Sequence, residues 1–394
     1  MDNTPPAPRE VKRTVWTFAS ASFLHDMGAD MIFAIWPMFL TTVLGANMAV
    51  VGLIDGLGNA FVSIAQAVAG YISDRTRKRK AFVWMGYFFG SVAKVGYALA
   101  PTWHWVLPFR ILDRSGKMRG APRDAIVSDL STDRNRGRHF GILRMMDNAG
   151  AMVGIIAAIV LVPLIPLRTL IMIAAIPSML AVLLVLFVYH ERTLNGTKVF
   201  KGIRLRDLSS DLRLYFVLSA FFSLGSFTYS FLLLSAKSVG FSIGTMPVLY
   251  LLYTAIAAAL SLSFGKLADR IGRKIVLLFS FGCWIGVALL FLFFRSHIIV
   301  IAAFALYGVH VASLEPVQKA LAAELAPRHL VASTLGGYQM IIGLVSLPAS
   351  LVAGLLWDRY GLGAPYLLSL ILTAFAGFLL LFLKDGRDGR AKLT

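Results

Sequence analysis

Long apolar stretches recur along the whole chain and constrain its fold more than any other feature. A window of about 19 residues finds twelve of them, each long enough to cross the roughly 30 Å core of a bilayer. The expected spans are 15–44, 48–72, 80–100, 103–129, 140–164, 169–189, 213–237, 246–268, 274–294, 298–326, 332–357 and 364–383. This pattern predicts an all-α integral membrane protein with twelve transmembrane helices.

The composition is typical of a protein that is surrounded by lipid. Of the 394 residues, 58% are apolar and 15% are charged, against about 45–50% and about 25% in soluble proteins. The net charge of +18 would by itself fit a nucleic-acid partner. Most Lys and Arg residues, however, lie on one side of the predicted spans, which is the positive-inside pattern. We therefore expect no nucleic acid as a partner and both termini in the cytoplasm.

We expect neither a cleaved signal peptide nor an intrachain disulfide. The N-terminal segment is polar and rich in proline, so it predicts no cleaved signal peptide. The single cysteine, Cys283, excludes an intrachain disulfide.

The chain also repeats itself. Gly70 to Lys78 reads Gly-Tyr-Ile-Ser-Asp-Arg-Thr-Arg-Lys, and Gly265 to Lys274 reads Gly-Lys-Leu-Ala-Asp-Arg-Ile-Gly-Arg-Lys, 195 residues later (265 less 70). At the same offset, Ala125, Asp129, Leu130 and Gly141 match Ala320, Glu324, Leu325 and Gly336. We predict two six-helix bundles, 15–189 and 213–383, a cytoplasmic linker at 190–212, and cytoplasmic tails at 1–14 and 384–394.

With these two loops, the sequence strongly resembles the major facilitator superfamily (MFS) of secondary transporters. The resemblance covers about residues 15 to 383 and implies alternating access around a midplane site. It also implies a cytoplasmic gate made by Gly70, Asp74, Arg75, Gly265, Asp269, Arg270 and Arg273. The first loop departs from the family pattern, since Thr76-Arg77 stand where the second has Ile271-Gly272. The competing interpretation is a loop that only anchors the topology.

A finer resemblance lies in the fourth span. The segment from Arg114 to Ala125 resembles an R-x-G-K-x-x-R-x-x-P-R-D-A element of a bacterial branch of the superfamily, with Met118 in place of a glycine. This branch implies no particular substrate.

Ionisable residues inside the predicted spans are the candidate functional groups, because each costs roughly 2.5–3.5 kcal/mol to insert and usually faces a cavity or a partner. Asp26, Asp30 and Glu315 are the candidates for proton coupling, since a carboxylate in a cavity that opens and closes changes its proton affinity. The resemblance implies that helices one, four, seven and ten line the central path.

A second set of residues is suited to bind substrate. Arg110, Arg114 and Lys117 fall at i, i+4 and i+7 on one helical face, where guanidinium groups suit a carboxylate or phosphate. The other substrate-binding candidates are Lys94, Arg144, Ser226 and Tyr229. The alternative is a buried charge network that only fixes helix packing. Its remaining members would be His25, Asp113, Arg123, Asp124, Asp147 and Lys319.

The sequence gives little information on the direction of transport and on the substrate. The antiporter motif of the family keeps its glycines at Gly150 and Gly154 but lacks the proline. We predict a monomeric transporter, not an enzyme, that exports a small organic or drug-like solute coupled to protons. It needs no cofactor or metal. The alternative is transport, including uptake, of an anionic metabolite or metal chelate. A non-transporting receptor or scaffold is the candidate from another class.

Overall fold

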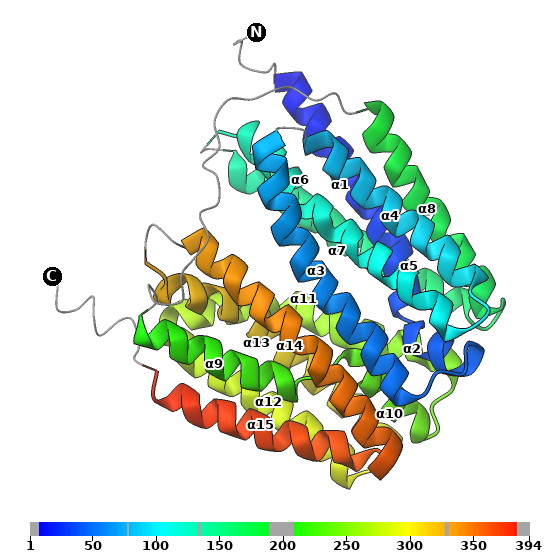
Figure 1. The fold of residues 1–394 in the computed structure, drawn as a ribbon, viewed down its shortest axis with the longest axis vertical. Coiled ribbons are helices and arrows are strands. Elements are labelled where there is room, and N and C mark those ends of the chain that lie inside the picture. Colours follow the sequence, from blue (N-terminus) through cyan, green and yellow to red (C-terminus); the bar gives the residue numbers. More distant parts are fainter. Residues whose placement is uncertain (1–7, 77–78, 133–134, 189–208, 328–330, 384–394) are drawn as a thin grey trace, which may run out of the picture. The chain divides into compact units, whose positions relative to one another are not determined.

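The computed structural model describes residues 8–76, 79–132, 135–188, 209–327 and 331–383. The side chains of residues 8, 70, 71, 74–76, 188, 332 and 333 are outside the description. All regular structure in these ranges is helical (Figure 1). Nine helices among the described residues are long and apolar enough to cross a membrane. The predicted spans 15–44, 80–100 and 103–129 fall outside this set, and they carry most of the ionisable residues placed inside spans in the first half.

Contacts group the chain into two compact units. The first comprises Met1–Phe39 and Phe61–Phe200, and the second Leu40–Ala60 and Lys201–Thr394. Helices of the first unit are α1 (Pro8–Phe33), α2 (Trp36–Met38), α4 (Arg79–Leu99), α5 (Trp103–Ser115), α6 (Gly120–Asp129), α7 (Arg136–Leu161) and α8 (Leu167–Val188). Helix α1 packs against α7 and α8, and α4 packs against α5 and α8 (Figure 1).

The second unit holds a matching set of helices. They are α9 (Ser210–Gly225), α10 (Tyr229–Ser238), α11 (Met246–Ile271), α12 (Arg273–Phe293), α13 (His297–Leu325), α14 (Val331–Tyr360) and α15 (Gly363–Leu381). Helix α13 packs against α11 and α12, and α9 against α14 and α15 (Figure 1). The predicted linker lies almost wholly outside the described residues, which resume at Ser209.

Helix α3 (Met48–Thr76) is divided between the two units, with its residues up to Ala60 in the second. The predicted bundle 15–189 contains the whole of this helix. Small residues on the first half of α3 pack closely on α14. A Cβ added to Gly52 or Gly56 would overlap the backbone of Ser350 or Leu347 on α14, so the two helices approach each other at their backbones.

Three predicted spans are not continuous helices. The first is interrupted after Phe33, before α2 and a π-helical turn at Phe39–Val43, and Pro37 cannot donate a helical hydrogen bond there. The fourth contains a 3₁₀ turn at Gly116–Arg119. The seventh is interrupted between α9 and α10, at Ser226–Thr228.

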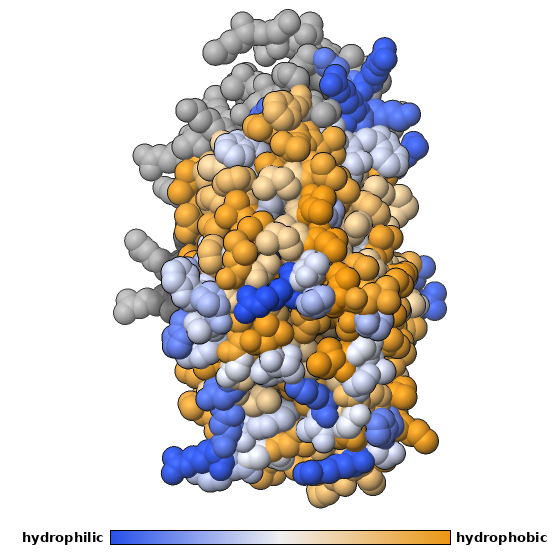
Figure 2. Space-filling model, turned by 90° about the vertical axis from the view of Figure 1, so that its right-hand side faces the viewer, coloured by the Kyte–Doolittle hydropathy of each residue, from blue (hydrophilic) through white to orange (hydrophobic). Residues whose placement is uncertain are grey.

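The exposed surface is largely apolar, as a lipid-facing surface must be. Large exposed side chains include Leu164, Phe187, Phe293, Ile298 and Phe382. Figure 2 shows one face on which hydrophobic residues dominate and hydrophilic residues gather in smaller patches. In water such a surface would drive association, whereas a bilayer satisfies it.

Candidate functional site

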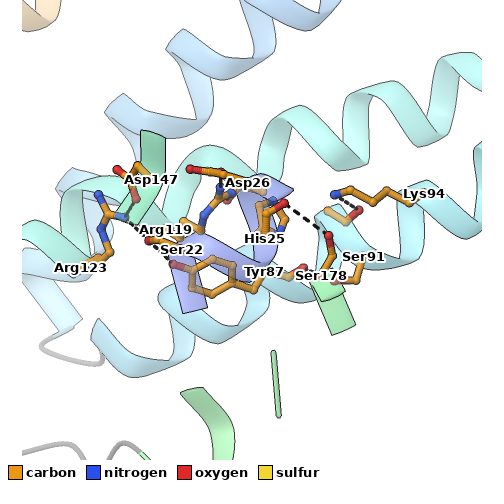
Figure 3. Close-up of polar contacts among 12 residues, drawn as sticks. Ser22, His25, Asp26, Tyr87, Ser91, Lys94, Arg119, Arg123, Asp147 and Ser178 are labelled. Atoms are coloured by element: carbon orange, nitrogen blue, oxygen red, sulfur yellow. Dashed lines mark hydrogen bonds and ion pairs between the residues drawn. The ribbon is translucent and has the colours of Figure 1, made fainter. Parts of the chain in front are cut away.

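A polar network lies inside the first unit, where α1, α4, α6 and α7 approach one another (Figure 3). At one end, the guanidinium of Arg123 on α6 donates to Ser22 Oγ on α1 at 2.5 Å and lies 3.5 Å from the Asp147 carboxylate on α7. It also bonds its neighbour Asp124 at 3.0 Å. Ser22 Oγ in turn lies 3.0 Å from the hydroxyl of Tyr87 on α4. One arginine thus connects four helices.

The next carboxylate along α1 is paired with a different arginine. Arg119, in the 3₁₀ turn, lies 3.7 Å from Asp26 Oδ1 and donates to the Gly116 carbonyl at 3.0 Å. Its guanidinium also covers the Tyr87 ring at 4.8 Å. The Arg119 side chain is 7% exposed and that of Asp26 is 21% exposed. Asp26 is therefore a partly accessible carboxylate beside a buried cation.

His25 and Lys94 occupy the buried interior of this network. The His25 ring meets the Tyr87 ring edge to face at 5.2 Å. Its Nδ1 has no hydrogen-bond partner among the described residues. Lys94 Nζ donates to the Gly90 carbonyl at 3.2 Å, and no carboxylate of the described part lies within ion-pair distance of it. Gly90 makes room for the imidazole, because a Cβ there would lie 2.6 Å from His25 Cε1.

The predicted basic stripe of the fourth span is divided by the 3₁₀ turn. Arg110 and Arg114 remain on α5, where their guanidinium groups cover Trp36 at 4.5 Å and Phe33 at 4.7 Å. Arg114 is also 3.6 Å from Asp113. Lys117 instead belongs to the turn. The turn forms where Gly116 packs on α4, since a Cβ on Gly86 would lie 2.6 Å from the Gly116 carbonyl oxygen.

Other candidates lie where solvent or lipid reaches them. Lys319, predicted in a buried network, is exposed, as is Glu315 one turn earlier. No ion pair joins these two described residues. Arg144 is 76% exposed and 3.9 Å from Asp147. Helical spacing placed these residues on shared faces but could not show which way each face turns. Asp30 is half-buried and belongs to α1 like Asp26.

The two repeated loops form equivalent ion pairs. Arg273 contacts Glu324 at 2.5 Å and Asp269 at 3.4 Å in the second unit, and Arg79 contacts Asp129 in the first. The two arginines that make these equivalent contacts are thus 194 residues apart in the sequence, one fewer than the 195-residue offset of the repeat. The side chains of Gly70, Asp74 and Arg75 are outside the description. Arg270 is exposed, and no atom lies within 4 Å of a Cβ added to Gly265.

The second unit contains a cavity of about 220 Å³ at the interruption between α9 and α10. No ionisable Asp, Glu, Lys, Arg or His side chain lines it. Its lining residues are Asn59, Ser219, Phe222, Ser223, Ser226, Phe227, Thr228, Leu314, Gln318, Tyr338, Ile342 and Ser346. Of the sequence candidates, Ser226 lines this cavity. Tyr229 instead packs edge to face on Tyr250 at 5.2 Å.

Asp55 is a buried carboxylate that the sequence analysis missed. It is 2% exposed, and one of its oxygens accepts hydrogen bonds from Ser230 at 2.5 Å and Thr228 at 3.1 Å. Both hydroxyls belong to the start of α10, where a helix favours negative charge. A lone carboxylate inside the span 48–72 was the available signal, since an intramembrane acid is a functional candidate by default.

Comparison with known proteins adds family and fold. The model of the Major Facilitator Superfamily matches residues 18–262 and 215–393. An uncharacterised MFS-type transporter of Methanocaldococcus jannaschii is 35% identical over 384 residues, covering 95% of this chain and 96% of that protein. Among solved structures, a D-xylose-proton symporter superposes with a TM-score of 0.76 at 14% identity, covering 96% of this chain and 99% of that one. The nucleoside transporter NupG gives 0.75 at 15%, covering 93% and 97%.

Proposed function

Since the chain belongs to the major facilitator superfamily of membrane transporters, we propose that it couples proton movement to export of a small organic solute by alternating access. The observation that carries the proposal is the pair of Asp26 and Arg119 inside the polar network of the first unit. A nearby cation favours the ionised carboxylate, and desolvation favours the protonated one. A conformational change that moves Arg119 away would therefore favour proton binding by Asp26, and one that admits water would favour proton release.

Export is the proposed direction because the chain keeps the glycines of the antiporter pattern, although it lacks the proline, and these glycines pack closely on α1. A Cβ on Gly150 or Gly154 of α7 would overlap the carbonyl oxygen of Phe23 or Met27 on α1. Both carbonyls belong to residues within four positions of Asp26. A change in the contact between α1 and α7 would thus act on the proposed proton site directly.

The proposed topology follows the distribution of basic residues. Both termini lie in the cytoplasm of a bacterial cell, the bundles 15–189 and 213–383 cross the inner membrane, and the chain works as a monomer. The paired loops with Arg79 and Arg273 would stabilise the cytoplasmic ends of helices on that side, and their ion pairs would break when it opens.

One observation favours a second candidate function, transport of an anionic metabolite or metal chelate. Lys94 is buried and has no carboxylate of the described residues within ion-pair distance. An anion entering the first unit would satisfy that charge. Arg110 and Lys117 would then assist, in keeping with the sequence prediction for the fourth span.

The experiment is a comparison of coupling and exchange in liposomes that contain a pH-sensitive dye. Solute-driven proton movement and equilibrium exchange of labelled solute are measured for wild type and for Asp26→Asn. We expect the variant to lose proton movement and to keep exchange, because the neutral amide preserves the shape of the site. Asp124→Asn is the matched control, since that side chain also contacts an arginine but is 41% exposed.

Three variants decide the role of the acids. Retention of solute-driven proton movement by Asp26→Asn, Asp30→Asn and Glu315→Gln alike would refute proton coupling through these residues. Binding of solutes without any exchange would instead support a receptor or scaffold.

A further inference from the structure

We propose that the cavity in the second unit binds the uncharged, hydroxyl-bearing part of the substrate, and that the transported solute is therefore a neutral polar compound of about the size of one sugar ring. This inference rests on the proposed transport function and names its substrate class. It is carried by the lining of the cavity, which combines hydroxyl and amide groups with aromatic rings.

The cavity offers hydrogen-bonding groups that the protein itself leaves unused. In the described part of the chain, no hydrogen bond is made by the hydroxyl groups of Ser223 and Ser226. Ser226 lies in the non-helical segment between α9 and α10. Irregular backbone within the membrane-spanning part of a protein is tolerated where it lines a cavity or is buried in protein. Both features fit a polar ligand at this point.

The fixed hydrogen bonds around the cavity determine what a ligand must supply. Thr228 donates its hydroxyl proton to Asp55, so its oxygen remains an acceptor. Tyr338 donates to Gln318 Oε1 at 3.2 Å, which leaves the amide nitrogen of Gln318 as a donor. A ligand therefore needs both donors and acceptors, and a hydroxyl group supplies both.

Aromatic side chains complete the wall. Phe222 is stacked on Phe281 at 4.2 Å, and Tyr338 is stacked on Tyr215 at 5.3 Å. These contacts hold the two rings in place, so they present rigid apolar surfaces beside the hydroxyl groups. A ring with one apolar face and a polar rim matches this arrangement.

Volume and charge restrict the ligand further. A cavity of about 220 Å³ is smaller than the roughly 300–1,000 Å³ of sites for drug-sized ligands. A carboxylate or ammonium group in it would meet no charged side chain in the lining, and the nearby Asp55 carboxylate already accepts hydrogen bonds from Ser230 and Thr228. An unpaired buried charge is costly. The cavity thus disfavours the drug-like and the anionic solutes considered above.

The test compares ligands that share one ring and differ in charge. Glucose, glucuronate and glucosamine are titrated against the purified full-length chain, with uridine and uridine monophosphate as a second pair, and binding is followed by thermal stabilisation. We expect glucose or uridine to stabilise the protein at lower concentration than its charged counterparts. Ser223→Ala, Ser226→Ala and Gln318→Ala should each weaken that binding about 2- to 10-fold, the range for one neutral hydrogen bond.

Ser261→Ala is the matched control, because that hydroxyl bonds its own helix at Ala257 and lies outside the cavity. Tighter binding of glucuronate, glucosamine or the monophosphate would overturn the proposal, as would a lack of binding by both neutral compounds. Neutral binding that survives all three cavity variants would also overturn it. The wild-type comparison remains decisive if a variant fails to fold. Because binding needs no gradient, neutral binding without solute-driven proton movement would refute the proposed coupling and leave this inference standing.

Discussion

Two arginines contact the same carboxylate from very different environments, and their removal should have very different costs. Arg123 and Arg144 both approach Asp147, at 3.5 Å and 3.9 Å. The Arg123 side chain is 11% exposed and that of Asp147 is 14% exposed, whereas that of Arg144 is 76% exposed. Arg123→Gln would leave a buried carboxylate without its buried cation, which costs about 3–5 kcal/mol. Arg144→Gln should cost about 0–1 kcal/mol, as exposed pairs do.

The contacts of Arg123 narrow the expected free-energy cost of Arg123→Gln. Its contact with Asp124 contributes little because that carboxylate is 41% exposed, so the cost comes from Asp147 and Ser22. We expect about 3 kcal/mol, at the lower end of the range. A loss of 1 kcal/mol lowers the melting temperature by about 2–4 °C for 150–250 residues. For the first unit, Arg123→Gln should therefore lower it by roughly 6–12 °C.

The assay is thermal unfolding of the purified variants in one detergent, with both single variants and the double variant Arg123→Gln/Asp147→Asn. The double variant should recover most of the loss, because no buried charge is left unpaired. Equal losses for Arg123→Gln and Arg144→Gln would refute the reasoning. The reasoning would also be refuted if Asp147→Asn, added to Arg123→Gln, lowered the stability further and recovered none of the first loss.

Two further substitutions test close packing and the buried acid. Gly154→Ala should destabilise the protein by about 1–3 kcal/mol, since its Cβ would overlap the Met27 carbonyl; Gly141→Ala on the same helix meets nothing within 4 Å and should be neutral or stabilising in thermal unfolding. Equal effects would contradict the packing argument. Asp55→Asn should cost roughly 1–3 kcal/mol, because two hydrogen bonds to a charged acceptor become neutral ones, and it should speed amide exchange in the first turn of α10. Unchanged amide exchange would show that Asp55 does not stabilise that turn. Asp269→Asn serves as the control, because the Asp269 side chain is 69% exposed.

The family and the helical architecture could be predicted from the sequence because they depend on local properties. Apolar length indicates most of the spans, nine of which are long and apolar enough to cross a membrane in the described part of the chain, and the repeated loops at Gly70 and Gly265 indicate the family. Because an unpaired buried charge is costly, ionisable residues in predicted spans are expected to have partners, and Asp26 on α1 and Asp113 on α5 both lie in ion pairs.

The partners of those charges could not be predicted in the same way. Asp26 pairs with Arg119 and Asp147 with Arg123 across helices, and helical spacing describes only one helix at a time. The 3₁₀ turn at Gly116 depends on close contact with Gly86, which no pattern within the fourth span reveals. Lys319 is exposed, and its spacing from Glu315 does not say which way their shared face turns.

The division of α3 between two units has a mechanical consequence. Its helix runs unbroken from Met48 to Thr76, so one continuous helix links the two units and its first half packs on α14. That contact is made by Gly52, Gly56 and Gly354, backbone against backbone. Separating glycine surfaces uncovers little apolar area and requires no large side chain to change rotamer. This contact is supplemented by hydrogen bonds that the Met48 amide donates to Asp358 and that the Thr228 hydroxyl donates to Asp55.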